Sequence, residues 1–271
     1  MNLVIGSSSQ LAHYFPNDYI KISSRNIDFD YLKNNKWDSV YITFAEQRIY
    51  DENIDYMTPN YLYTLEIINS LINNSNKIVC YTSCELWAES RGHISITSRP
   101  VFNKNNKYAL SKLFLLEDVI RLRKINSIYN KIIFIHPFYF NSTYRSEYFL
   151  FGKIFDSIIN KKQIEVGDLN FSRDMVHTSF VVQKSIAASK DSMVGSGYLF
   201  NVRRYIQDLY EINNLNYYHY VKENISDEKN QDKLIRSKVP WIYTYQNLLD
   251  DTQRDIESKR EKNGFDRGAL R

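Results

Sequence analysis

Cysteine is scarce in this sequence, with two residues among 271. Cys80 and Cys84 are too few for a disulfide framework, and they lack the companion ligands that a zinc site requires. We therefore predict that both thiols are reduced and that the chain holds no metal ion.

Long apolar runs and a strong excess of one charge are missing as well. No stretch approaches the roughly 20 unbroken apolar residues of a membrane span, and the first residues lack the basic region and apolar run of a signal peptide. We therefore expect a cytoplasmic protein with no membrane partner. The net charge of +4, spread over basic residues with acids between them, gives no support for nucleic-acid binding.

The sequence instead contains short apolar runs that alternate with amphipathic stretches, which is typical of βαβ units around a parallel sheet. Helical spacing of apolar residues predicts helices over residues 60–72 and 106–126. The six predicted strands cover residues 3–5, 19–22, 39–43, 77–81, 132–135 and 198–202. We therefore predict an α/β fold in a single domain, with a Rossmann-like doubly wound parallel sheet.

The first predicted strand runs into a glycine, and we expect a helix to follow it. Such a helix N-terminus offers unpaired N–H groups and a positive dipole end to the pyrophosphate of a dinucleotide. Ser9 and Ala12 stand where a G-x-x-G-x-x-G motif has its second and third glycines. A strand, turn and helix without a ligand is the alternative. The predicted cofactor-binding residues of this turn are Gly6, Ser8, Ser9, Gln10 and Leu11.

Ser24 and Arg25 follow the second predicted strand. An acidic residue at this place receives the ribose hydroxyls of NAD, whereas serine and arginine accommodate the 2′-phosphate of NADP. The sequence therefore favours NADP over NAD as cofactor. The alternative is that Arg25 is an ordinary exposed loop residue.

Tyr108 and Lys112 are four residues apart at the start of a predicted helix, so their side chains share a face. An ammonium beside a phenol lowers the tyrosine pKa. Tyr108 could then exchange a proton with a sugar hydroxyl or ketone while hydride moves to or from the cofactor. Ser83 follows the strand over 77–81, at the sheet edge where it could hydrogen-bond the same substrate oxygen. Capping of the next segment is the alternative role for Ser83.

In order and spacing, these segments resemble the extended short-chain dehydrogenase/reductase superfamily, in the group of NAD-dependent epimerases and dehydratases that act on nucleotide sugars. The resemblance implies a dinucleotide-binding core over about residues 1–137 and 178–204. It also implies a smaller, mainly C-terminal substrate-binding portion over about 138–177 and 205–258, followed by a polar tail over 259–271. The residues that carry it are 6–12, 83–87, 108–112, 164–168, 173–180, 198–202 and 239–250.

The same resemblance assigns roles to single residues. It makes Ser83, Tyr108 and Lys112 a catalytic triad, in which Tyr108 and Lys112 also contact the cofactor and Ser83 the substrate. Arg173 becomes a contact to the nucleotide diphosphate, for which a guanidinium fork is suited. A structural ion pair with a neighbouring aspartate is the alternative for Arg173.

Two further positions concern the substrate. The order Ser83-x-Glu85-Leu-Trp is similar to the pattern in GDP-mannose 4,6-dehydratases, where the glutamate is a general base. A solvent-facing or capping carboxylate is the alternative for Glu85. Tyr139 stands where the family has a substrate-contacting asparagine, and the Gly-Pro turn that follows in the family is missing.

The resemblance thus implies an NAD(P)-dependent epimerase, dehydratase or ketoreductase that acts on a nucleotide sugar in bacterial surface-polysaccharide biosynthesis. By analogy with many relatives we expect a homodimer, paired through the segments 60–72 and 106–126. The alternative hypothesis is a non-catalytic binding or regulatory protein with the same fold. The loss of two motif glycines and the change at Tyr139 favour that alternative.

Overall fold

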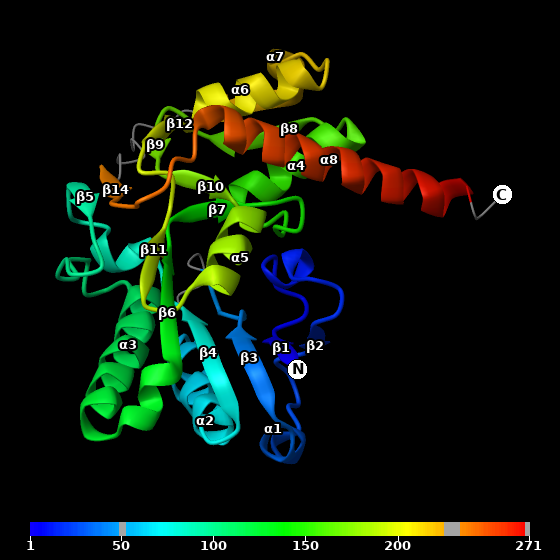
Figure 1. Ribbon diagram of the computed structural model, residues 1–271. Coiled ribbons are helices and arrows are strands. Elements are labelled where there is room, and N and C mark those ends of the chain that lie inside the picture. The colour runs from blue at the N-terminus through cyan, green and yellow to red at the C-terminus, as the bar shows by residue number, and fades with distance from the viewer. Residues whose placement is uncertain (49–52, 225–233, 269–271) are drawn as a thin grey trace.

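The computed structural model describes residues 1–48, 53–224 and 234–268, and its centre is a six-stranded sheet. All pairings in this sheet are parallel, in the order β2-β1-β3-β4-β6-β11 (Figure 1). The predicted doubly wound sheet is confirmed. Its strands are β1 (Asn2–Ile5), β2 (Ile20–Ile22), β3 (Trp37–Ile42), β4 (Ser75–Tyr81), β6 (Ile132–Pro137) and β11 (Ser192–Val194).

Helices cover both faces of the sheet. Side chains alternate along each strand, so Leu3 and Ile5 pack on one face while Val4 packs on the other. The first face is covered by α1 (Phe29–Asn34), α2 (Tyr63–Leu71) and α3 (Lys107–Ile125), and the second by α5 (Thr178–Ala187). The helices predicted over 60–72 and 106–126 are therefore confirmed as α2, which a π-helical turn over Thr58–Leu62 precedes, and α3.

The predicted sixth strand over residues 198–202 is wrong. The sixth strand of the sheet is β11, whose Met193 pairs with His136. Within 198–202, β12 (Phe200–Asn201) pairs with β9 (Ser172–Arg173) outside the sheet, and α6 (Val202–Ile212) begins immediately afterwards. The apolar run at 198–202 combines a short edge pairing with the first turn of an amphipathic helix.

The helix expected after Gly6 is also missing. A single 3₁₀ turn, η1 (Ala12–Tyr14), follows β1, and the chain is extended at Phe15. Pro16 explains this ending, because a proline disfavours helical backbone at the residue before it. Aromatic rings cover the sheet in place of a helix: the Phe15 and Tyr19 rings lie 4.6 and 6.0 Å from the Tyr41 ring.

The remaining elements lie above the carboxyl edge of the sheet (Figure 1). The helix α8 runs through residues 259–268, which the sequence predicts as a polar tail, and residues 269–271 lie outside the described residues. In chain order these elements are η3 (Cys84–Trp87), β5 (Gly92–Ile94), β7 (Tyr139–Asn141), α4 (Leu150–Asn160), β8 (Ile164–Gly167), β9, β10 (Met175–His177), β12, α6, α7 (Tyr217–Tyr220), β13 (Val221–Asn224), β14 (Ile235–Ser237) and α8 (Tyr245–Gly268). The short turn η4 (Ser127–Lys131) lies at the opposite edge, where Lys131 donates to the carbonyl of Ser75 at the start of β4.

A buried carboxylate joins three segments of this upper portion. Asp174 Oδ1 accepts hydrogen bonds from the backbone and hydroxyl of Ser196 at 2.6 and 2.8 Å. Asp174 Oδ2 accepts from the backbone and hydroxyl of Ser237 at 2.7 Å each, and from the Gly197 backbone at 3.1 Å. Gly195 is required beside it, because a Cβ there would lie 2.4 Å from Ser237 Oγ and 2.8 Å from Asp174 Oδ1.

We expect Asp174→Asn to lower the free energy of unfolding by about 3 kcal/mol, because the new amide group would face donors that then lack an acceptor. Thermal unfolding should show a decrease in Tm of roughly 10 °C. Asp38→Asn is the matched control, since Asp38 is exposed and, within the described ranges, its carboxylate pairs with the N-terminal amine alone. A Tm of Asp174→Asn equal to that of the control would contradict the structural role of Asp174.

Candidate active site

The catalytic candidates meet where β4 and α3 approach the upper portion. Ser83 follows β4, and its hydroxyl accepts a hydrogen bond from the Glu85 backbone at 3.2 Å. This is the capping role that the sequence left open. The same hydroxyl lies close enough to the Tyr108 phenol to lower its pKa, so capping and proximity to Tyr108 occur together.

Tyr108 lies in the first turn of α3 and is 7% exposed. The side chain of Asn106 begins this helix by accepting a hydrogen bond from the Ala109 backbone at 3.0 Å. Burial raises the pKa of the Tyr108 phenol, whereas the hydrogen bond with Ser83 and the nearby guanidinium of Arg145 lower it. A buried, protonated phenol with one hydroxyl partner is suited to donate a proton to a substrate oxygen.

Lys112 lies one turn further along α3 and is 4% exposed. Burial lowers the pKa of Lys112 to about 8, and the Cys80 thiol opposes this shift. Among the described residues, no group hydrogen-bonds the Lys112 ammonium. Two hydroxyls of a bound dinucleotide would satisfy such an ammonium, so this residue fits the cofactor contact that the sequence predicts.

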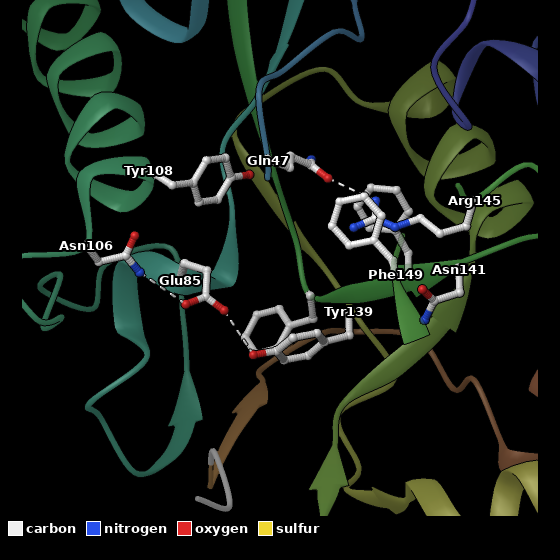
Figure 2. A pocket seen from close by; sticks show the side chains of 10 residues that line it. Gln47, Glu85, Asn106, Tyr108, Tyr139, Asn141, Arg145 and Phe149 are labelled. Atoms are coloured by element: carbon white, nitrogen blue, oxygen red, sulfur yellow. Dashed lines mark hydrogen bonds between the residues drawn. The ribbon is translucent and has the colours of Figure 1, made fainter. Parts of the chain in front are cut away.

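The carboxylate of Glu85 accepts hydrogen bonds from two neighbouring side chains. The Tyr139 hydroxyl donates to Glu85 Oε1 at 3.0 Å, and the Asn106 amide donates to Oε2 at 3.4 Å (Figure 2). Burial raises the pKa of Tyr139 well above its ordinary value, so the phenol remains a donor. The carboxylate of Glu85 therefore has a fixed position beside the phenol of Tyr108.

These side chains line one cavity of about 220 Å³. Figure 2 shows Glu85, Asn106 and Tyr108 on one side of this cavity and Asn141, Arg145 and Phe149 on the other. Three of the predicted site residues, Glu85, Tyr108 and Tyr139, are therefore brought together. The complete lining is Gln47, Glu85, Asn106, Tyr108, Phe138, Tyr139, Phe140, Asn141, Arg145 and Phe149.

Arg173 lies next to this cavity. Its guanidinium carbon is 5.3 Å from the Tyr139 ring centroid and 4.5 Å from the Phe171 ring centroid. One of its nitrogens donates to the Ser172 carbonyl at 2.8 Å. The positive charge of Arg173 also lowers the pKa of Tyr139, against the effect of burial. Arg173 is thus close enough to the pocket to contact a ligand that extends beyond Tyr139.

The predicted nucleotide turn lies at the crevice between β1 and β3, where the strand order reverses and doubly wound folds bind ligands. The Thr43 hydroxyl donates to the Ile5 carbonyl at 3.0 Å and accepts from the Ser9 hydroxyl at 2.8 Å. Gly6 has a φ of +107°, and a Cβ on it would lie 2.9 Å from Thr43 Oγ1. Glycine is therefore required at position 6 by its close contact with Thr43, which follows β3. The Ser9 hydroxyl already donates a hydrogen bond to Thr43.

The rest of the turn contributes in different ways. Gln10 is buried, and its side-chain oxygen accepts hydrogen bonds from the hydroxyls of Ser142 and Thr178 at 3.3 Å each. Leu11 is part of the hydrophobic core. The Ser8 side chain is exposed at the tip of the turn. Contacts from Gln10 and Leu11 to a cofactor would therefore come from their backbone.

Ser24 and Arg25 follow β2, as the sequence places them. Ser24 is partly buried, and Arg25 is exposed. In the described part of the chain, no acidic side chain forms an ion pair with the Arg25 guanidinium. Arg25 is therefore accessible to an anionic group bound at this edge of the sheet.

Gln47 and Asn106 line the pocket, although no sequence pattern predicts them there. Arg145 Nη1 donates to Gln47 Oε1 at 2.9 Å, although 98 positions separate the two residues. No local pattern connects them. The only usable signal was the position of Gln47 shortly after a strand that ends at the ligand-binding edge.

Comparison with solved structures identifies the fold. RMD from Pseudomonas aeruginosa, complexed with NADPH, is 18% identical with a TM-score of 0.74, over 95% of this chain and 99% of that chain. The dTDP-glucose 4,6-dehydratase DesIV from Streptomyces venezuelae, with NAD and TYD bound, is 14% identical with a TM-score of 0.74, over 98% of both chains. The UDP-glucuronic acid 4-epimerase from Bacillus cereus, in complex with NAD, is 14% identical with a TM-score of 0.72, over 94% of this chain and 96% of that chain.

No protein-family model and no curated protein matches the sequence. The structural likeness covers nearly the whole chain and confirms the predicted resemblance to extended short-chain dehydrogenase/reductase epimerases and dehydratases at the level of the fold. Within the described ranges, no helix is long and apolar enough to cross a membrane.

The depressed pKa of Lys112 predicts a pH-dependent stability. Between about pH 8 and 10.5 the unfolded chain binds the Lys112 proton more than the folded chain does, so stability rises with pH. We expect Lys112→Met to be more stable than the parent at pH 7, by up to about 3 kcal/mol, with the difference fading towards pH 10.5. Urea unfolding of the cofactor-free protein at pH 7, 8.5 and 10 measures this.

Lys107→Met is the matched control, because Lys107 lies on the same helix and is exposed. Its stability relative to the parent should not depend on pH in this range. A difference between Lys112→Met and the parent that is the same at all three pH values would show that Lys112 titrates normally.

Proposed function

We propose that this chain is an NAD(P)-dependent enzyme that modifies the sugar of a nucleotide sugar, as an epimerase, a dehydratase or a ketoreductase. The observation that carries the proposal is the meeting of the Tyr108 phenol with the Glu85 carboxylate at one pocket, with the Ser83 hydroxyl close to the phenol. This pocket lies above the carboxyl edge of the sheet, where doubly wound folds bind ligands.

Each group has a role in the proposed reaction. A bound nicotinamide supplies or accepts hydride. Tyr108 gives a proton to, or takes it from, the oxygen of the reacting sugar carbon, and Ser83 hydrogen-bonds the same oxygen. Lys112 binds hydroxyls of the cofactor with its buried ammonium. Ser83 and Arg145 both lower the pKa of the Tyr108 phenol, against the effect of burial.

Glu85 is the candidate general base for a dehydratase reaction. The two hydrogen bonds from Tyr139 and Asn106 fix its carboxylate beside the pocket. Removal of a proton next to a transient ketone needs a positioned carboxylate of this kind. An epimerase that inverts the carbon next to a transient ketone needs the same base, so the position of Glu85 suits a reaction that passes through such a ketone.

We expect Tyr108→Phe to lower kcat by at least about 100-fold, because the variant keeps the ring and loses the proton that the reaction transfers. Cofactor affinity should change by less than about threefold, since the phenol hydroxyl is one contact among many. Turnover of a panel of nucleotide sugars and fluorescence titration with NADPH measure the two quantities. Tyr56→Phe is the control, because its ring packs edge-on against Tyr108. Full activity of Tyr108→Phe rules out the proposed role.

We further propose NADP as the preferred cofactor. The solved relatives bind NAD or NADPH, so the preference rests on this chain alone. Ser24 and the accessible guanidinium of Arg25 stand at the end of β2, and a 2′-phosphate there would form charge-assisted hydrogen bonds with both.

Arg25→Ala should therefore weaken NADPH binding by about tenfold and leave NADH binding unchanged, since the lost hydrogen bond to a charged group concerns only the 2′-phosphate. Isothermal titration with both cofactors measures the ratio. Arg91→Ala controls for the loss of one positive charge at an exposed position. Equal weakening of both cofactors would place Arg25 away from the 2′-phosphate.

A specific observation supports a second candidate, a non-catalytic protein that binds a nucleotide or nucleotide sugar. The turn after β1 has one 3₁₀ turn in place of a helix, so a pyrophosphate there would lack a helix dipole. This candidate predicts weak or absent binding of both NADPH and NAD. The cofactor titration with the parent protein decides between the two.

We propose a cytoplasmic enzyme of bacterial surface-polysaccharide biosynthesis that forms a homodimer through the exposed side of α2 and α3. Leu62, in the π-helical turn before α2, and Phe114 of α3 are 53% and 40% exposed, and apolar residues of this kind are suited to a contact between two copies. The nucleotide-sugar substrate is its proposed small-molecule partner.

A further inference from the structure

Arg145 is a cation in the wall of the active-site pocket. It follows β7, in the loop that leads to α4, and its guanidinium carbon lies 3.7 Å from the Phe149 ring centroid. Nη1 donates to Gln47 Oε1 at 2.9 Å (Figure 2). Ring stacking and one amide contact therefore hold the guanidinium in a single orientation.

This guanidinium has no counter-charge among the residues that the structure describes. In the part of the chain that the structure describes, no carboxylate forms an ion pair with Arg145, and its Nε is buried without a hydrogen-bond partner. Burial lowers the pKa of Arg145 to about 10, which leaves the group charged at neutral pH. An uncompensated buried charge is costly unless a ligand supplies its partner.

The orientation of Arg145 selects the kind of anion. Because Gln47 occupies Nη1, the side of the fork formed by Nε and Nη2 remains for a ligand. Two parallel N–H groups on that side match the two oxygens of a carboxylate. Arg145 also shares the pocket with Tyr108, so the anion must lie close to the carbon that reacts.

That position separates Arg145 from the expected site of the diphosphate. The diphosphate of a nucleotide sugar is several bonds away from a reacting ring carbon, whereas a carboxylate on the sugar ring is near it. Arg173 lies beyond Tyr139 and remains the candidate for the diphosphate. One cation thus lies in the pocket wall and a second lies beside it, so that each end of such a ligand has a cation.

We propose that Arg145 binds a carboxylate on the sugar of the substrate, so that this site takes a nucleotide-linked uronic acid. The inference rests on the proposed nucleotide-sugar function and names its substrate class. Arg145 is then a specificity-determining residue, and neutral sugars bind without the contact to its free side.

Isothermal titration with UDP-glucuronic acid, UDP-glucose and UDP tests this. The first should bind the parent protein at least about tenfold more tightly than the second, as for one bidentate hydrogen bond to a charged group. Glucuronic acid 1-phosphate and glucose 1-phosphate form a second pair, in which the identity of the base plays no part. Equal affinities within both pairs, or no binding of any of them, overturn the proposal.

Arg145→Met keeps the length of the side chain and its contact with Phe149, and it should abolish the preference for the uronic acid. The affinities for UDP-glucose and UDP should change by less than about twofold, since neither ligand carries the carboxylate. Arg204→Met is the control for charge, because Arg204 is exposed on α6. A preference that survives in Arg145→Met, or a loss of UDP affinity itself, overturns the assignment.

Gln47→Glu is a second variant that is nearly isosteric. It would place a carboxylate 2.9 Å from Arg145 Nη1 and should also reduce the preference for the uronic acid, while UDP-glucose binding persists. An unchanged preference in a folded Gln47→Glu protein contradicts the proposal. Because the readout is a ratio of sugar affinities, its failure is separate from failure to bind NADPH or NAD, which would reject the proposed enzyme instead.

Discussion

The buried carboxylate of Asp174 is the interaction on which the upper portion of the molecule depends. Its five hydrogen bonds join the residue before β10 to the loop after β11 and to β14. The Asp174 carbonyl also accepts from the Tyr139 backbone at 3.1 Å, which fixes the start of β7. The position of Tyr139, and through it of Glu85, is therefore set by a carboxylate that never faces the pocket.

The pocket itself is assembled from segments that the chain brings together from far apart. Ser83 and Glu85 come from the end of β4, Tyr108 from the first turn of α3, and Arg145 from the loop after β7. The end of β4 positions Ser83, and hydrogen bonds from other side chains fix Glu85. Helix α3 positions Tyr108, and a hydrogen bond with ring stacking holds Arg145. A local change in either part would alter the distance between the phenol and the carboxylate, which acid–base chemistry requires to be fixed.

Periodicity predicted those parts of the fold that are long enough to show it. The strands β1, β2, β3, β4 and β6 and the helices α2 and α3 all follow from apolar spacing. The strand β11 was missed because its two apolar residues, Met193 and Val194, have small or polar neighbours on both sides. The motifs led to Ser83, Glu85, Tyr108 and Tyr139 because their order along the chain is that of a known family. The contact of Arg145 with Gln47 could not be predicted, because no short-range pattern encodes a contact over 98 positions.

The missing helix after β1 has a consequence for how long a dinucleotide would stay bound. A helix dipole favours an anion by about 0.3–1 kcal/mol, and η1 is too short to provide it. Since about 1.4 kcal/mol corresponds to a factor of ten in affinity, a dinucleotide on this turn would leave up to about five times faster. Rapid exchange of this kind suits a cofactor that is replaced after each turnover better than one that is retained through many catalytic cycles.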